Sequence, residues 1–197
     1  MRSRLILSAP QDADSAAIEK ALSAGDVAAL VIPAGATHLR AIVAATQNAG
    51  AAALLGYDFA EGDRPPWPLA YGADGVHAAG DLAARSTAVD TRPEGATIGA
   101  IATNRHEAMS LGELGADYLW FGNTRTLDEE AVELGIWWQA VFEIPAVVAG
   151  PCNAAAIDLM IATKVEFIAV DVFSSAEDPG DWVMMINNRL DQGLASS

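Results

Sequence analysis

Eight short apolar segments recur along the chain, and most of them are followed by an amphipathic stretch. Each segment is apolar throughout instead of alternating between polar and apolar residues, which is typical of strands buried on both faces of a parallel sheet. We predict strands at 4–8, 27–32, 51–56, 73–77, 96–101, 117–122, 145–150 and 166–172. We predict helices at 12–24, 36–49, 104–114, 129–142 and 153–162, and a last helix that opens in 174–190.

Eight strand–helix units favour a closed (β/α)₈ barrel, the TIM barrel, formed as a single small domain over residues 1–197. A doubly wound open sheet is the alternative that the same pattern allows. The chain is 52% hydrophobic, which is enough for one domain with a sizeable core.

Two helix starts carry capping-box spacing, in which a polar residue precedes a glutamate by three positions. Asn104 and Glu107 form one such pair, and Ser174 and Glu177 form the other. We expect Asn104 to open the helix at 104–114 and Ser174 to open the last helix.

The formal net charge is −15, and the chain has only two lysines. Nucleic acids and anionic membrane surfaces are bound through clustered Lys and Arg, so we expect neither as a partner. The charge also disfavours anionic substrates unless a metal ion or local dipoles compensate for it. A solvated acidic surface accounts for most of the charge.

We expect a cytoplasmic protein. No apolar run reaches the length needed to cross a bilayer, and the apolar run near the N-terminus is too short for a signal peptide. The single cysteine, Cys152, cannot form an internal disulfide and has no histidine near it in sequence, so we assign it no nucleophilic role. The adjacent Trp137 and Trp138 suggest that one ring packs on the barrel and the other marks a homo-oligomer contact.

In barrels of this kind the site lies at the carboxyl ends of the strands, a rule that selects Ser8, Cys152 and Asp171 among others. Asp58 and Asp81 follow neighbouring strands there, and two carboxylates with a bound diphosphate suit Mg²⁺. The alternative is that these aspartates only cap turns or a helix.

His77 ends the fourth predicted strand. A histidine at this position can act as a general acid or base. The alternative, which we favour, is a structural histidine that is satisfied by a backbone carbonyl.

The loops after the seventh and eighth strands commonly cradle phosphate, because helix N-termini there offer free N–H groups. Gly150, Ser174 and Ser175 are the candidate donors, although Pro151 lacks an N–H and the charge of Asp171 opposes a phosphate. Ordinary helix capping is the alternative role for these residues.

We expect the loop that follows the sixth strand to supply a cation at this end of the barrel. Asn123 and Thr124 are further candidate phosphate ligands, and Arg125 is the candidate that can grip phosphate with paired hydrogen bonds. An exposed loop arginine is the alternative.

Five segments together resemble the thiamine-phosphate synthase family, which includes the related aminothiazole tautomerases. They are "LLGYD", "GADGVHAAGDL", "ATIGAIATNRHEAMSLGELGADYLWFG", "IPAVVAG" and "VFSSAEDP", in the family's order and spacing. The resemblance implies a barrel that joins an aminopyrimidine diphosphate to a thiazole phosphate and releases pyrophosphate. It implies a phosphorylated small-molecule ligand and Mg²⁺, with Asp58 and Asp81 at the positions of the family's metal-binding aspartates.

The chain departs from the family pattern where phosphate would be held. The family's lysine-containing loops after the second and sixth strands are here "VIPAGATHLR" and "NTRTLDEEA", so Arg125 is the only cation of the latter. Tyr57 replaces an asparagine, Ile101 stands at a serine position, and Asp171 enters the last phosphate loop. The tautomerase branch has a histidine where this chain has Asn123.

Two hypotheses follow. In the first, the protein is a divergent thiamine-phosphate synthase whose missing cations are replaced by Arg125, by Arg64 or by a residue of a partner subunit. In the second, the protein is a catalytically degenerate barrel that binds a thiamine-related or other small ligand without turnover.

Overall fold

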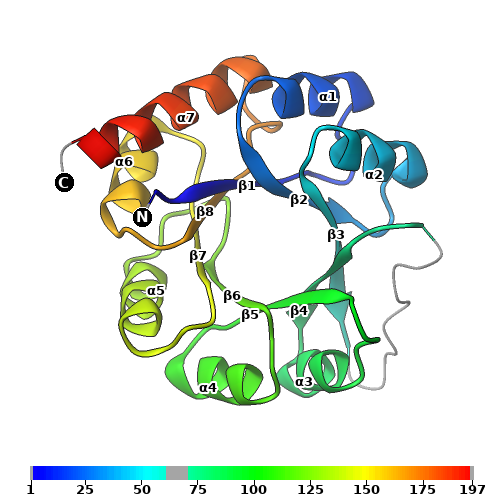
Figure 1. Ribbon diagram of the computed structural model, residues 1–197, viewed down its shortest axis with the longest axis vertical. Coiled ribbons are helices and arrows are strands. Elements are labelled where there is room, and N and C mark those ends of the chain that lie inside the picture. The colour runs from blue at the N-terminus through cyan, green and yellow to red at the C-terminus, as the bar shows by residue number, and fades with distance from the viewer. Residues whose placement is uncertain (1, 61–70, 196–197) are drawn as a thin grey trace.

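The predicted (β/α)₈ barrel is confirmed by the computed structural model, which describes residues 2–60 and 71–195. Eight parallel strands pair in chain order into a closed ring, and seven helices of the described part surround it (Figure 1). The strands are β1 (Arg4–Ser8), β2 (Val27–Pro33), β3 (Ala52–Phe59), β4 (Gly75–Gly80), β5 (Thr97–Ile101), β6 (Tyr118–Gly122), β7 (Ala146–Ala149) and β8 (Phe167–Val170). The helices are α1 (Ser15–Ser23), α2 (Leu39–Asn48), α3 (Leu82–Asp90), α4 (Arg105–Glu113), α5 (Glu129–Val141), α6 (Ala154–Ala162) and α7 (Pro179–Ala195).

The ring closes where β8 pairs with β1, with Ile168 opposite Leu5. This pairing excludes the open doubly wound sheet, which would leave the first and last strands at separate positions. Arg64 and the three prolines that follow it lie outside the described residues.

Most element boundaries differ from those expected by a few residues, and α3 forms in a segment for which no helix was predicted. Two of the differences concern residues singled out from the sequence. β3 runs on to Phe59, so Asp58 belongs to a strand that pairs with β4 and not to the loop beyond it. The expected start of the last helix at Ser174 is wrong, because α7 begins at Pro179. Asp178 there accepts hydrogen bonds from the N–H groups of Gly180 and Asp181, and proline suits the first helical position.

The other expected cap is confirmed. The side chain of Asn104 accepts from the N–H of Glu107 at 3.0 Å, and α4 begins at the next residue, Arg105. Glu107 also accepts from Thr103 and pairs with the buried Arg85 of α3 at 3.2 Å. Burial raises the pKa of Glu107, but the hydrogen bonds from Thr103 and the charge of Arg85 outweigh it and hold that pKa below its usual value.

Side chains alternate between the outside and the inside of the barrel wall. Those that point outward form the large core between the sheet and the helices. Trp138 belongs to this core, stacked on Phe142 at 3.9 Å, while the half-buried Trp137 lies under the guanidinium of Arg105. The smaller inner core consists of Ile6, Ala29, Val31, Leu54, Tyr118, Trp120, Val147, Ala149 and Ala169.

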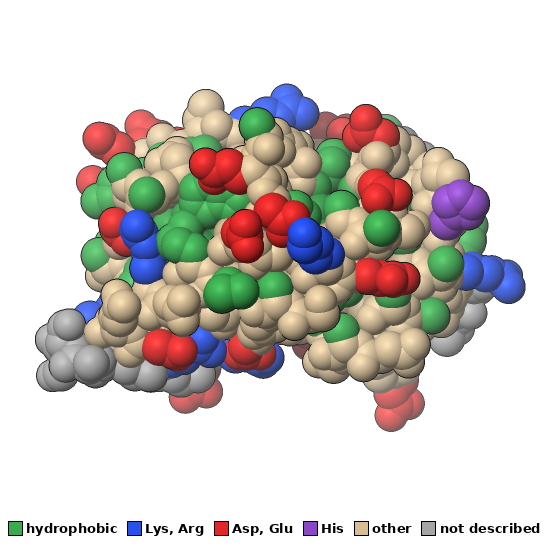
Figure 2. Space-filling view, turned by 90° about the horizontal axis from the view of Figure 1, so that it is seen from above, with side chains coloured by type: hydrophobic (Ala, Val, Ile, Leu, Met, Phe, Trp, Pro, Cys, Tyr) green, Lys and Arg blue, Asp and Glu red, His purple; other side chains and the backbone are tan. Residues whose placement is uncertain are grey.

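On the face shown in Figure 2, Asp and Glu side chains are spread among Lys, Arg and apolar atoms and do not form one patch. In the part of the chain that is described, no helix is long and apolar enough to span a bilayer.

His77, Tyr118 and Trp120 fill the interior of the barrel on the side of β4 to β6. A hydrogen bond of 3.0 Å joins His77 Nδ1 to Tyr118 Oη, and the ring of Trp120 lies 4.6 Å from that of His77. All three side chains are buried. Gly99 of β5 makes room for them, since a Cβ at this position would lie 1.8 Å from the ring of Tyr118.

We predict that Gly99→Ala destabilises the protein by about 3 kcal/mol or more, because the Tyr118 ring is confined by the barrel wall and cannot move away. Urea unfolding measures the loss. The control is Gly35→Ala, whose new Cβ meets only the end of the flexible Gln11 side chain. Equal stability of the two variants would contradict the packing described here.

Burial lowers the pKa of His77 from 6.5 to about 4. The folded state therefore binds fewer protons at this histidine than the unfolded state does. The contribution of His77 to the free energy of unfolding is present above pH 6.5 and is lost as pH falls toward 4. We predict that the histidine accounts for about 3 kcal/mol of the stability lost between pH 7 and pH 4. Denaturant unfolding across this range should show that the free energy of unfolding falls less on acidification in His77→Gln than in the wild type.

The control for this comparison is His106→Gln, which changes an exposed histidine of α4. The pH profile of this variant should follow that of the wild type. A His77→Gln profile parallel to the wild type would contradict a buried, neutral His77.

Candidate functional site

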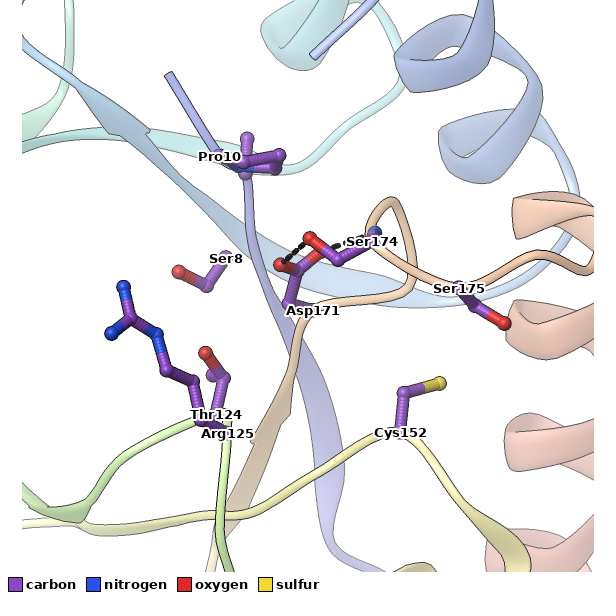
Figure 3. A pocket seen from close by; sticks show the side chains of 9 residues that line it. Ser8, Pro10, Thr124, Arg125, Cys152, Asp171, Ser174 and Ser175 are labelled. Atoms are coloured by element: carbon purple, nitrogen blue, oxygen red, sulfur yellow. Dashed lines mark hydrogen bonds between the residues drawn. The ribbon is translucent and has the colours of Figure 1, made fainter. Parts of the chain in front are cut away.

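A cavity of about 490 Å³ opens at the carboxyl ends of the strands, between β1 and the loops after β6, β7 and β8 (Figure 3). The residues that line it are Ser8, Ala9, Pro10, Thr124, Arg125, Cys152, Asp171, Ser174 and Ser175. Four of the predicted site residues therefore meet in one cavity, namely Thr124, Arg125, Ser174 and Ser175. Ser8, Cys152 and Asp171, which the strand-end rule also selected, join them.

The loop after β8 is organised by the half-buried carboxylate of Asp171. Its Oδ1 accepts from the N–H of Phe173 at 2.9 Å and from the N–H of Ser174 at 3.1 Å. Its Oδ2 accepts from Ser174 Oγ at 2.5 Å, as the dashed lines in Figure 3 show. Ser175 Oγ instead accepts from Trp182 Nε1 and from the N–H of Glu177.

The loop after β6 is organised in a similar way by Asn123. Its Oδ1 accepts from the N–H groups of Arg125 and Thr126 at 2.9 and 3.0 Å. The side chain of Arg125 is exposed and lines the cavity, and Figure 3 shows it beside Ser8 and Thr124. Asn123 itself does not line the cavity.

The loop after β7 offers few donors to a ligand. The N–H of Gly150 donates to Ala169 O at 3.1 Å, and Gly150 does not line the cavity. Asn153 caps α6 through the N–H of Ala156. Burial, together with the charges of Asp171 and Glu177, raises the pKa of Cys152 to about 12, so its thiol stays protonated.

Asp58, near the end of β3, and Asp81, directly after the neighbouring β4, lie outside this cavity. The N–H of Asp81 donates to Phe59 O at 2.9 Å, so the two exposed aspartates lie at the carboxyl ends of adjacent strands, Asp58 one residue before the end of β3 and Asp81 one residue after β4. Asp81 stands at the N-cap of α3 but makes no side-chain cap hydrogen bond. Asp58 Oδ1 lies 2.8 Å from the position that a Cβ of Gly80 would occupy, so this glycine leaves room for the carboxylate.

These two carboxylates fit a metal ion that takes its other ligands from a bound diphosphate and water. Neither is used for helix capping, and hard oxygen donors are the ligands that Mg²⁺ prefers. Within residues 2–60 and 71–195, no three His, Cys, Asp or Glu side chains gather as a protein-only metal site.

His77 does not reach the cavity. Its bond to Tyr118 replaces the backbone carbonyl that we expected as its partner, and burial raises the pKa of the Tyr118 phenol. Both groups therefore stay neutral near pH 7 and are shielded from a ligand at the strand ends.

Known proteins show the same fold. Thiamine phosphate pyrophosphorylase from Pyrococcus furiosus superposes with a TM-score of 0.76 at 20% identity, covering 97% of this chain and 96% of that one. A 3-hexulose-6-phosphate synthase from Salmonella typhimurium gives a TM-score of 0.72 at 17% identity, covering 98% of this chain and all of that one.

Sequence comparison is more specific. The chain is 34% identical to a thiamine-phosphate synthase from Hyphomonas neptunium over 94% of its length and 93% of that protein. A thiamine-phosphate synthase from Erythrobacter litoralis is 36% identical over half of each chain. The family model described as thiamine monophosphate synthase matches residues 5–172, from β1 to the loop that carries Asp171. With this match and a relative that aligns over nearly the whole chain, the protein belongs to the thiamine monophosphate synthase family.

Proposed function

We propose that this protein joins an aminopyrimidine diphosphate to a thiazole phosphate at the mouth of the barrel and releases pyrophosphate. Besides the family membership, one observation carries the proposal. Asp58 and Asp81 lie at the carboxyl ends of the adjacent strands β3 and β4, and neither carboxylate caps a helix of the described residues. Two carboxylates without a hydrogen bond or an ion pair to the residues that the structure describes are suited to a site for a metal-bound diphosphate.

The proposed reaction breaks the bond between the methylene carbon of the pyrimidine and the diphosphate oxygen, and forms a bond from that carbon to the thiazole. The electron pair of the broken bond leaves with the diphosphate. A Mg²⁺ ion bound by the two aspartates would neutralise the charge that develops on this leaving group.

The chain's own residues would position the two substrates. Asp58 and Asp81 are proposed to hold the diphosphate end through the metal. Arg125 is proposed as the cation that grips phosphate oxygens on the opposite side of the mouth, where Thr124 and Ser8 offer hydroxyl groups. Ser174 and Ser175 complete the proposed binding surface for the second substrate, while Asn123 positions its own loop.

His77 and Gly150 remain predictions as ligands, and both would need a rearrangement to reach a substrate. His77 is buried against Tyr118, and the N–H of Gly150 is engaged by Ala169. A cytoplasmic location and a homo-oligomer remain parts of the proposal that rest on the sequence.

We predict that Asp58→Asn and Asp81→Asn each lower Mg²⁺-dependent formation of thiamine phosphate by about 100-fold or more, because each removes a charged ligand of the leaving-group metal. Product is measured as its fluorescent oxidation product, over a range of Mg²⁺ concentrations. The control is Asp90→Asn, which removes an exposed carboxylate at the far end of α3.

Activity that is unchanged in both aspartate variants would contradict the metal assignment. Absence of product from the folded wild-type protein would instead favour the non-catalytic alternative, a barrel that binds a thiamine-related ligand without turnover.

A further inference from the structure

The helix that follows Asp81 opens without a side-chain cap. Each of the three helices after it, α4, α5 and α6, begins with a side chain that accepts from an N–H of the first turn, namely Asn104, Asp128 and Asn153. Asp81 stands at the same position of α3, but its carboxylate makes no such bond. The start of α3, which carries one of the two proposed metal ligands, therefore depends on other contacts for its position.

Arg85, near the start of α3, supplies contacts of this kind. Its N–H donates to Asp81 O at 2.9 Å, which places the buried side chain one helical turn beyond Asp81. The guanidinium extends to the neighbouring β5 and α4 (Figure 1). Nη1 donates to Ile101 O, and both Nη1 and Nη2 donate to Glu107 Oε2 at 3.2 Å. One side chain thus ties the start of α3 to the carboxyl end of β5 and to the start of α4.

Glu107, the carboxylate that pairs with Arg85, is itself held at the carboxyl end of β5. Its Oε2 also accepts from the N–H of Thr103 at 2.9 Å and from Thr103 Oγ1 at 3.0 Å. Thr103 lies in the loop after β5, and the next residue, Asn104, caps α4. Arg85 is therefore bonded to a point that the loop after β5 and the first turn of α4 hold together.

Stability alone does not account for a charged side chain at the place of Arg85. This residue is 4% exposed, and its Nε has no hydrogen-bond partner among the described residues. A buried N–H without a partner costs free energy, and apolar side chains can often replace a buried ion pair without loss of stability. What an apolar side chain cannot supply is a directed bond to Ile101 O and to Glu107.

The position of the first turn of α3 decides where the Asp81 carboxylate lies relative to that of Asp58. The N–H of Asp81 is fixed to Phe59 O of β3, whereas its side chain has no hydrogen bond or ion pair to the described residues. Mg²⁺ demands near-ideal octahedral geometry with ligand distances of about 2.0–2.1 Å. A small displacement of the start of α3 would therefore weaken the binding of a metal ion by the two aspartates.

We propose that Arg85 is a positioning residue, which holds the start of α3 so that the carboxylates of Asp58 and Asp81 can bind one divalent metal ion. This inference rests on the proposed function, in which these two aspartates are the metal ligands. It adds a residue that acts on the metal only through the backbone between Asp81 and Arg85.

The experiment removes the tie but keeps the buried volume filled. The double variant Arg85→Met with Glu107→Gln replaces the ion pair by neutral side chains of similar size, and the glutamine keeps an oxygen acceptor for Thr103. Binding of Mn²⁺ in the presence of inorganic pyrophosphate is measured from the electron paramagnetic resonance of unbound Mn²⁺. We expect at least tenfold weaker binding than in the wild type, whereas urea unfolding should give a free energy of unfolding close to that of the wild type.

The matched control is Arg92→Met, which breaks an ion pair with Asp117 beyond the other end of α3. This variant should bind Mn²⁺ as tightly as the wild type does. In the synthesis assay, the Mg²⁺ concentration that gives half-maximal rate should rise at least tenfold in the double variant, while kcat at saturating Mg²⁺ should fall less than threefold.

Hydrogen exchange in the wild type tests the proposal without any variant and without a ligand. The N–H of Arg85 donates to Asp81 O, and the N–H of Ala108 donates to Asn104 O at the equivalent place of the capped α4. If Arg85 holds the start of α3, its amide hydrogen should exchange at a rate within tenfold of that of Ala108. Exchange at Arg85 that is more than tenfold faster would contradict the proposal, because the start of α3 would then open freely.

The two kinds of failure are distinguishable. If the wild type forms no product but the double variant binds Mn²⁺ at least tenfold more weakly than the wild type, the reaction is wrong and the role of Arg85 stands. If the wild type is active and the double variant binds Mn²⁺ as tightly as the wild type does, the reaction stands and the role of Arg85 is wrong. If the wild type binds no Mn²⁺ with pyrophosphate, the metal assignment and the role of Arg85 are both wrong.

Discussion

Closure of the sheet by the pairing of β8 with β1 is the constraint on which the rest of this structure depends. Once the ring is closed, every strand has two neighbours and no edge is left unpaired. Because all strands are parallel, their carboxyl ends meet at one rim. Ser8 and Asp171, which lie at opposite ends of the chain, consequently line the same cavity.

The closed ring also separates the interior from the rim. Within the ring, Tyr118 packs against Gly99 and holds His77 through a hydrogen bond, so the centre of the barrel is filled by side chains. The buried histidine is neutral, and it contributes to folding and not to the charge of the mouth. The side chains open to a ligand therefore lie near or beyond the carboxyl ends of the strands.

The strands could be predicted from the sequence because burial on both faces requires a continuous run of apolar residues, which is rare in loops. The sequence predicted the end of β3 poorly, because Gly56, Tyr57 and Asp58 have the composition of a turn, whereas pairing with β4 keeps them extended. Two possible helix starts precede α7, the capping-box spacing of Ser174 and Glu177 and the Asp178–Pro179 pair, and the helix begins at the second. Residue spacing alone does not show which of two such starts a helix uses.

Part of the candidate site could be predicted for a related reason. The rule that active residues follow barrel strands found Thr124, Arg125, Ser174 and Ser175, which do meet in one cavity. The sequence also indicated that the charge of Asp171 opposes phosphate. It could not indicate that this carboxylate turns back onto its own loop, because the direction of a side chain depends on the backbone around it.

The position of the Asp171 carboxylate also affects the order of the loop after β8 in the free protein. Where the N–H groups of a loop have no acceptor until phosphate binds, the loop becomes ordered only on binding. The entropy lost in this ordering reduces the affinity for the ligand. Here Asp171 supplies the acceptors at all times, so the loop after β8 is ordered during folding. The amide hydrogens of Phe173 and Ser174 should therefore exchange slowly in the free protein. The loop should keep the same conformation when a ligand binds.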